Sequence, residues 1–343
     1  MNLIISILTL LFTPSTLAVT IRGGTSLLYA TLGEIFTERS GILNLGVEGM
    51  MIMGAVTGFA AAFKTGNVWA GVITGMIVGG LLALIHAFLT ITLRASQTVS
   101  GLALTLFGSG LASFLGQRLG PGGTPLVGRI GPKFGKLPVP GLSSIPFLGQ
   151  AFFQQDILVY AVYLLVPLAW YFLYKTRPGL HLRAVGENPQ TADAMGVNVA
   201  GIRYLYTIVG GMLVGLGGAH LSLAYTPGWT EGMTAGRGWI AIALVIFATW
   251  DPGRAVVGAI LFGAINAIQL RLQAQGTTIP AAFLNMMPYA FTILVLVVIT
   301  WWEAFSRRVG APAALGLPYV REEIAEGLPT GAKGLGLVGS AEL

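Results

Sequence analysis

The residue patterns that hydrolyse bonds or bind nucleotides are missing from this sequence. It has no cysteine, which excludes disulfides and thiolate metal sites, and it has neither an HExxH nor a GxSxG pattern. The phosphate-binding pattern GxxxxGK[S/T] also fails at Gly135-Lys136, because Ile130 and Leu137 occupy two required positions. A nucleotide-driven step would therefore need a separate subunit.

Polar side chains do occur inside long apolar segments, where they are costly unless they face a cavity or another helix. Ser109 and Ser113 are four residues apart and share a helix face with Thr105, which suits the lining of a pore. Hydroxyls also bond backbone carbonyls and pack helices, so both interpretations stay open. The candidate pathway residues are Ser100, Thr105, Ser109, Ser113, Asn266, Gln269 and Asn285.

The composition indicates whether water or lipid surrounds these segments. The chain has 343 residues, of which 54% are hydrophobic and only 9% are charged, whereas a soluble domain carries about 25% charged residues. Its apolar runs reach the roughly 20 residues that cross a bilayer, and in lipid such runs must be helical. The sequence therefore predicts an all-α, polytopic membrane helical bundle. The net charge of +6 is spread among loops and does not indicate nucleic-acid binding.

Ten apolar segments are expected, of which the second and eighth are short enough to be broken or re-entrant helices, so the predicted number of spans is eight to ten. The first is interpreted as an uncleaved span. The segments are 3–20, 24–37, 46–63, 68–93, 98–117, 157–175, 204–226, 238–250, 254–271 and 282–302.

Basic residues favour one orientation, with both termini in the cytoplasm. Ten spans then place four basic residues of short loops outside, Arg22, Lys64, Arg237 and Arg271, and nine inside, namely Arg39, Arg94, Lys175, Arg177, Arg183, Arg203, Arg254, Arg307 and Arg308. We expect a transmembrane domain over 1–306 with an external loop at 118–156, and a flexible cytoplasmic tail over 307–343.

Small residues recur every four positions in several segments, as at Gly71, Gly75 and Gly79, at Gly211 and Gly215, and from Ala255 to Ala267. Residues at this spacing lie on one helix face and let two helices approach closely. The stripes predict a compact bundle.

The cytoplasmic loop 176–203 has signals for a short helix of its own. Asn188 is a good N-cap, Pro189 suits the first helical position and Gly196 suits the position after the last turn. These signals predict a helix from Pro189 to Met195. So short a helix needs support from the rest of the protein or from a partner.

This loop also resembles a known family. The pattern resembles the cytoplasmic coupling loop of permeases in bacterial ABC importers, in the branch of the ribose-type and branched-chain amino acid permeases. The residues that carry this resemblance are Gly179, Arg183, Ala184, Gly186, Asn188, Ala192 and Gly196. Two further stretches, 38–50 and 96–104, look most like nucleoside and simple-sugar permeases. The resemblance covers about residues 20–305.

The resemblance implies a transport subunit, not an enzyme, in a bacterial inner membrane. It implies that the seven loop residues dock on ABC ATPase subunits, which use ATP-Mg, so that the chain needs no cofactor of its own. The other implied partners are a second, related permease chain in a heterodimer and an external substrate-binding lipoprotein. A nucleoside is the first expected cargo, a ribose-type sugar the second and a branched-chain amino acid the third.

One rival of another class is an ion-coupled secondary transporter, which needs acidic residues at the bilayer midplane. Glu34, Glu48 and Asp251 all fall near segment ends, which counts against it. Asn44 is expected to cap the third segment, with Glu48 near the positive end of that helix.

Overall fold

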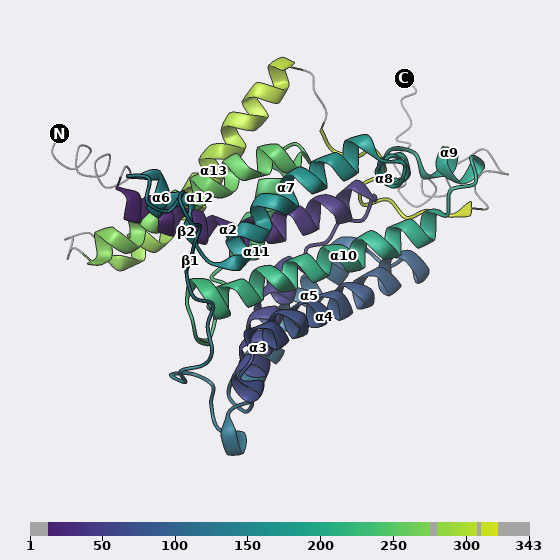
Figure 1. The fold of residues 1–343 in the computed structure, drawn as a ribbon. Coiled ribbons are helices and arrows are strands. Elements are labelled where there is room, and N and C mark those ends of the chain that lie inside the picture. Colours follow the sequence, from purple (N-terminus) through teal and green to yellow (C-terminus); the bar gives the residue numbers. More distant parts are fainter. Residues whose placement is uncertain (1–12, 275–279, 307–309, 322–343) are drawn as a thin grey trace, which may run out of the picture.

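The computed structural model describes residues 13–274, 280–306 and 310–321, and these form an all-α bundle. Figure 1 shows long helices that run across the molecule from one end to the other. The longer elements are α2 (Pro14–Arg39), α3 (Val47–Thr65), α4 (Val68–Ala87) continued by η1 (Phe88–Thr92), α5 (Gln97–Gly116), α7 (Ile157–Lys175), α10 (Val199–His220) continued by η3 (Leu221–Tyr225), α12 (Pro252–Ala274) and α13 (Ala281–Ser306).

Most of the shorter elements lie at the two ends of these helices. At one end are η2 (Pro121–Gly123), α6 (Leu148–Phe152) and a two-stranded antiparallel sheet of β1 (Leu137–Pro138) and β2 (Gln154–Gln155). At the other end are α8 (Arg177–Glu187) and α9 (Pro189–Ala194), which Figure 1 places together beyond α7 and α10. We call this second end of the bundle the α8–α9 end.

Helix α2 occupies the centre of the bundle and corrects one expectation. The predicted segments 3–20 and 24–37 are not separate spans in the described residues, because Pro14–Arg39 is a single helix. Almost all of it is buried, including polar side chains such as Ser26 and Thr31. Small and hydroxyl-bearing residues suit a helix surrounded by protein. Their low hydrophobicity interrupts the apolar run, so the sequence predicted two segments where the structure has one helix. Residues 1–12 lie outside the described part of the chain.

The stripes of small residues pack against one another as expected. A Cβ atom added to Gly79 would lie 2.3 Å from the carbonyl oxygen of Gly211, and one added to Gly215 would lie 2.2 Å from that of Gly75. Helices α4 and α10 therefore touch through their backbones. On α12, Ala259 packs in the same way against Gly24 of α2, where an added Cβ would meet the Ala259 carbonyl at 2.6 Å.

Six described helices are long and apolar enough to cross a membrane: α3, α4 with η1, α5, α7, α10 with η3, and α12. Helix α11 (Arg237–Phe247) has only 11 residues and is a shorter apolar helix. It corresponds to the eighth predicted segment and agrees with the expectation of a broken helix there. The threading of ten separate spans does not hold in the described residues, because the first two segments share α2.

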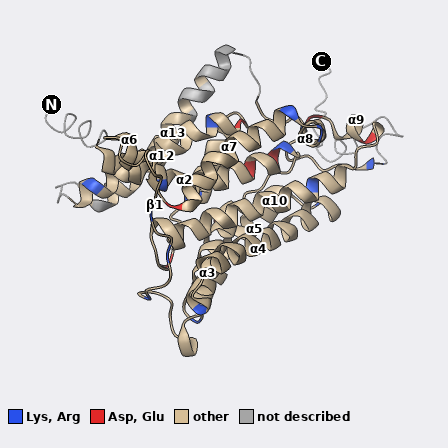
Figure 2. Ribbon diagram, in the orientation of Figure 1, with Lys and Arg blue, Asp and Glu red and all other residues tan. Residues whose placement is uncertain are grey.

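Charged residues gather mostly towards the two ends of the bundle, as Figure 2 shows. Arg39 lies at the α8–α9 end, where its guanidinium is 3.9 Å from Glu187 of α8. At the opposite end the side chain of Arg22 donates a hydrogen bond of 2.9 Å to Gln155 of β2. Arg237 differs from the expectation of a loop residue, because it is buried and donates to the carbonyl of Gly23.

Candidate functional site

The predicted helix in the loop 176–203 is present as α9, and its start signal works as expected. The Asn188 side chain accepts a 2.9 Å hydrogen bond from the backbone N–H of Thr191, and Pro189 takes the first helical position. After the helix, Gly196 has a φ of +82°, a left-handed conformation that favours glycine. The loop is thus folded by its own local residues.

One side of α9 packs on the protein and the other is exposed. Pro189 and Ala192 are buried, and Ala192 joins Val185 and Val199 in a small apolar cluster. By contrast Met195, directly after the helix, is 80% exposed. The motif did not include Met195, although a large apolar side chain on a protruding turn is a common feature of docking surfaces.

Several motif residues hold the loop in place and are not exposed to a partner. An added Cβ at Gly179 would lie 2.0 Å from the carbonyl oxygen of Phe172, and one at Gly186 would lie 2.2 Å from that of Arg39. Glycine is needed at both positions because α8 lies against the end of α7 and the end of α2. Arg183 is half-buried, with its guanidinium 5.2 Å from the ring centre of Tyr174.

Residues 310–321 lie against this loop, which corrects the expectation of a flexible tail for this part of 307–343. The backbone N–H of Ala314 donates to the Gly186 carbonyl at 2.8 Å, and that of Gly316 donates to the Gly41 carbonyl at 3.2 Å. Arg321 forms an ion pair of 3.1 Å with Asp193 of α9. The remaining tail residues, 307–309 and 322–343, lie outside the described part of the chain.

Tyr319 belongs to the same docked segment and packs against the apolar cluster around Ala192. Burial raises the pKa of its hydroxyl, and the Asp193 carboxylate beside it raises that pKa further. The hydroxyl therefore stays protonated at neutral pH. The α8–α9 loop, the end of α2 and residues 310–321 together form one packed unit.

Two of the candidate pathway residues on α5 already have partners inside the bundle. Ser100 is buried and lies 2.9 Å from the Nδ1 atom of His86 on α4. Thr105 donates a 2.8 Å hydrogen bond to the carbonyl of Leu45, just before α3. Both hydroxyls pack helices together. Ser109 and Ser113 are half-buried, next to a face of α5 on which Leu106 is 75% exposed.

The other three pathway candidates lie on α12 and α13. The side-chain amide of Gln269 donates a 2.6 Å hydrogen bond to the Asn285 side chain, which joins the two helices. Asn266 is half-buried one turn earlier on α12. Figure 1 places α12 and α13 on the other side of α2 from α4 and α5. The seven predicted residues therefore form two separate groups and not one lining.

Glu48 makes contacts that the sequence did not reveal. Its carboxylate accepts hydrogen bonds from the Thr234 hydroxyl at 2.6 Å and from the backbone N–H groups of Gly236 and Gly238 at 3.0 and 2.6 Å. These N–H groups flank the start of α11, where an anion is favourable. Glu48 thus lies in the first turn of its own helix, as expected, and also holds the start of another.

Asn44 does not cap α3, contrary to the expectation from the sequence. Helix α3 begins after Gly46, and the Asn44 side chain accepts from the N–H of Gly46 at 2.9 Å. Its amide donates to the Glu34 carboxylate at 3.3 Å. Asn44 is fully buried and provides a partner for a buried acid of α2.

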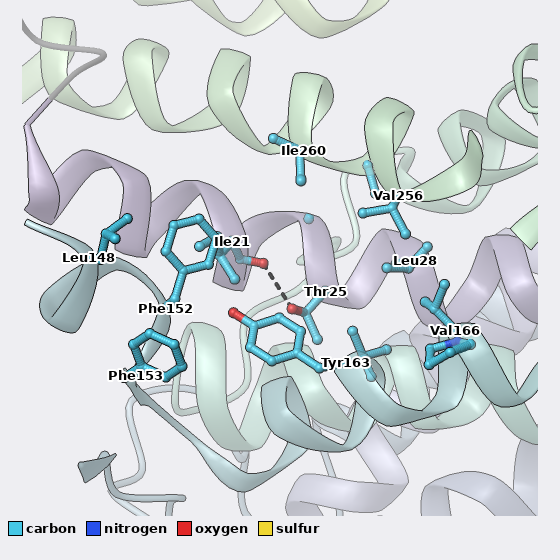
Figure 3. A pocket seen from close by; sticks show the side chains of 14 residues that line it. Ile21, Thr25, Leu28, Leu148, Phe152, Phe153, Tyr163, Val166, Val256 and Ile260 are labelled. Atoms are coloured by element: carbon cyan, nitrogen blue, oxygen red, sulfur yellow. Dashed lines mark hydrogen bonds between the residues drawn. The ribbon is translucent and has the colours of Figure 1, made fainter. Parts of the chain in front are cut away.

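An apolar cavity of about 520 Å³ lies between α2, α6, α7 and α12 (Figure 3). Phe152 and Tyr163 form part of its wall, and the Thr25 hydroxyl is bonded to the Ile21 carbonyl at 2.8 Å. None of the predicted pathway residues lines it. With few polar groups in its wall, the cavity suits a hydrocarbon chain better than a hydroxyl-bearing solute.

Comparison with known proteins agrees with this architecture. The family model of the branched-chain amino acid transport system permease component matches residues 16–302. The "Putative glucose ABC transporter permease protein" of Haloferax volcanii is 43% identical, over 91% of this chain and 99% of that protein. A nucleoside ABC transporter permease of Lactococcus lactis is 37% identical, over 87% and 94% of the two chains.

A guanosine ABC transporter permease of Bacillus subtilis is 36% identical, over 86% of this chain and 93% of that protein. These relatives are transport components that work beside ATPase subunits, and they are not enzymes. Because the family model covers most of the chain and the relatives align along nearly their whole length, the chain belongs to the branched-chain amino acid transport system permease family and is a multi-pass ABC transporter permease.

Proposed function

We propose that the chain is the permease subunit of an importer that moves a nucleoside across a bacterial inner membrane. The observation that carries this cargo is the 37% and 36% identity to permeases named for nucleosides and guanosine, over more than nine-tenths of each of those proteins. The stretches 38–50 and 96–104, which resemble nucleoside and simple-sugar permeases, agree with it.

The charges inside the described bundle favour an uncharged cargo. Glu48 is bonded to the start of α11, and Glu38 accepts a 2.5 Å hydrogen bond from the Trp250 indole. The buried Arg237 donates to the Gly23 carbonyl and lies over the Tyr225 ring. A charged solute would need an opposite charge that is free to meet it. A nucleoside needs only hydrogen-bonding groups and apolar surface.

The half-buried hydroxyls of Ser109 and Ser113 are the best candidates for contact with this cargo. They lie beside exposed apolar residues of α5, including Leu106 and Phe107. In a membrane such an apolar face contacts either lipid or another helix. A second, related permease chain packed against it would enclose a pathway between the two chains. An external binding lipoprotein would deliver the solute to the end of the bundle opposite α8 and α9.

The energy for transport would enter at the α8–α9 end, which we assign to the cytoplasmic side. The exposed side of α9, with Met195 beside it, docks on the ATPase subunit in this proposal. ATP-Mg binds in that subunit, so the permease needs no cofactor. The packing of α8 on α2 and α7 through Gly179 and Gly186 would transmit the movement to the bundle.

A hexose is the second candidate cargo. It is favoured by the 43% identity to the permease named for glucose, which aligns over 99% of its length. A ribose-type sugar has the same hydrogen-bonding chemistry as the sugar part of a nucleoside. The nucleoside proposal and the sugar proposal therefore share the transport mechanism and differ only in cargo.

Uptake of labelled guanosine, adenosine, glucose, ribose and leucine tests the proposal in cells that express the complete transporter. The control cells carry an ATPase subunit that cannot hydrolyse ATP. Uptake of nucleosides alone, abolished in the control, is the expected result. Uptake of glucose or ribose alone would replace the nucleoside by a sugar, and uptake indifferent to the inactive ATPase would contradict the importer mechanism.

A further inference from the structure

A polar pocket of about 260 Å³ opens at the α8–α9 end, apart from the candidate pathway and from the exposed side of α9. Four segments of the chain form it: the turn after η1, helix α9, the start of α10 and residues 310–321. Its charged and polar lining residues are Arg94, Asp193, Asn198, Arg203, Tyr319 and Arg321.

The charges around this pocket do not balance. Arg321 is paired with Asp193 at 3.1 Å, and these two charges cancel. Arg94 and Arg203 form no ion pair with any described residue. The described wall of the pocket therefore carries about two positive charges that lack a negative partner.

Arg203 is the least expected member of the wall, because its side chain is only 2% exposed. One terminal nitrogen, Nη1, donates to the Leu317 carbonyl at 3.2 Å. The other two guanidinium nitrogens, Nε and Nη2, are buried without a hydrogen-bond partner in the described residues. A cation held in this way is unfavourable unless an anion or another acceptor reaches it.

The start of α10 adds a second anion-binding element. Val199 and Ala200, the first two residues of this helix of 22 residues, also line the pocket. N–H groups in a first helical turn have no partner within the helix, and the helix dipole favours a negative charge there. The Asn198 side chain is occupied, since it accepts from the N–H of Gly201 at 2.9 Å.

We propose that this pocket binds a phosphate group. Two unpaired guanidinium groups and a helix N-terminus match a group that carries up to two negative charges and several acceptor oxygens. The group belongs either to a soluble phosphate or phosphate ester or to the headgroup of an anionic lipid. Bound there, it joins α9, α10 and residues 310–321, and so stiffens the unit next to the proposed ATPase dock.

Thermal unfolding of the full-length chain in neutral detergent tests the site, without ATPase subunits because these bind phosphate themselves. Inorganic phosphate is the probe, with sodium chloride of equal ionic strength as the reference. We expect phosphate to raise the unfolding temperature of the wild type in a saturable way. Arg94→Gln and Arg203→Gln are expected to weaken the apparent affinity about tenfold or more, as loss of a charged partner does.

Arg254→Gln is the matched control, because Arg254 is an exposed arginine at the same end that does not line the pocket. It should keep the wild-type response. Arg94 is exposed, so Arg94→Gln decides the matter even if Arg203→Gln does not fold. Equal phosphate responses in the wild type and Arg94→Gln, together with equal responses in the lipid experiment, would overturn the proposal.

Nanodiscs distinguish the two sources of the phosphate group. The wild type and Arg94→Gln are compared in dioleoyl phosphatidylcholine alone and with phosphatidylglycerol added. If the group is a lipid headgroup, phosphatidylglycerol stabilises the wild type more than Arg94→Gln, and inorganic phosphate removes the difference. If it is soluble, phosphate stabilises the wild type equally in both lipids.

The chain carries two acidic residues directly after the pocket, Glu322 and Glu323, and these provide the last test. Their double replacement by glutamine should leave the phosphate response of the protein unchanged. If neither phosphate nor phosphatidylglycerol acts on the wild type but phosphate acts on the double variant, the chain's own carboxylates fill the pocket. That result would refute the phosphate assignment.

Discussion

The Glu48 carboxylate, in the first turn of α3, accepts a 2.6 Å hydrogen bond from the backbone N–H of Gly238, in the first turn of α11. Two helices that are almost two hundred residues apart in the sequence thus share one buried anion. An added Cβ on Gly238 would lie 2.4 Å from the Glu48 backbone, so the helices also touch at this point. The start of the short helix α11 is therefore fixed from another part of the bundle.

Replacement of Glu48 tests this link. Glu48→Ala leaves the N–H groups of Gly236 and Gly238 without their acceptor, which should cost about 3 kcal/mol of the free energy of unfolding. Glu48→Gln keeps one acceptor oxygen and should cost less. Thermal unfolding in detergent measures both, with Glu231→Gln at an exposed glutamate as control. Equal unfolding temperatures for Glu48→Ala and the wild type would show that the link does not stabilise the protein.

The close approach of α4 and α10 predicts a large effect of a single methyl group. Gly79→Ala places a Cβ 2.3 Å from the Gly211 carbonyl, and the forced separation should cost about 1–3 kcal/mol. Gly110→Ala is the matched control, because a Cβ at Gly110 of α5 meets nothing within 4 Å. There alanine should be neutral or slightly stabilising. The prediction fails if both variants unfold at the same temperature.

The exposed side of α9 predicts a separation between docking and folding. Met195→Asp should reduce co-purification of the ATPase subunit about tenfold and leave the stability of the permease unchanged, since Met195 is 80% exposed. Arg183→Glu should reduce both, because Arg183 packs on Tyr174. Ile130→Asp, at a residue that is 96% exposed outside this loop, is the control. Full ATPase recovery with Met195→Asp would argue against docking at this surface.

The hydroxyls of α5 should divide into two kinds. Ser109→Val and Ser113→Val should raise the KM for uptake several-fold without loss of stability, if these half-buried residues contact the cargo. Ser100→Ala should instead lower the unfolding temperature, because it removes one of the two hydrogen-bond partners of the buried His86. Initial uptake rates and thermal unfolding of each variant separate the two effects. A KM unchanged in both valine variants would remove α5 from the pathway.

The docked segment 310–321 predicts where truncation becomes harmful. A chain that ends after Arg321 keeps the ion pair with Asp193 and the bond from Ala314 to Gly186, and should keep its stability. A chain that ends after residue 309 exposes the apolar cluster of Val185, Ala192 and Val199, and should unfold at a lower temperature. Similar unfolding temperatures for the two truncated chains would contradict a stabilising role of this segment.

The sequence by itself determined those features that depend on nearby residues. Apolar runs long enough for a bilayer predicted membrane helices, small residues every four positions predicted a compact bundle, and Asn188, Pro189 and Gly196 predicted the limits of α9. The resemblance of the loop motif to ABC permeases identified the family. In each case the physical cause acts within a few turns of chain, so that the pattern of residue types is enough.

Only the tertiary structure decided which polar residues already have hydrogen-bond partners inside the protein. Ser100 and Ser109 look alike on one helix, yet only the position of His86 on α4 separates a packing hydroxyl from a candidate pathway residue. Glu48 falls near a segment end in the sequence, but α11 folds over it and makes it a buried link. Likewise residues 310–321 have no periodicity. Their backbone N–H groups are held by hydrogen bonds to the carbonyls of Gly41 and Gly186. These contacts join segments far apart in the chain, and no local pattern encodes them.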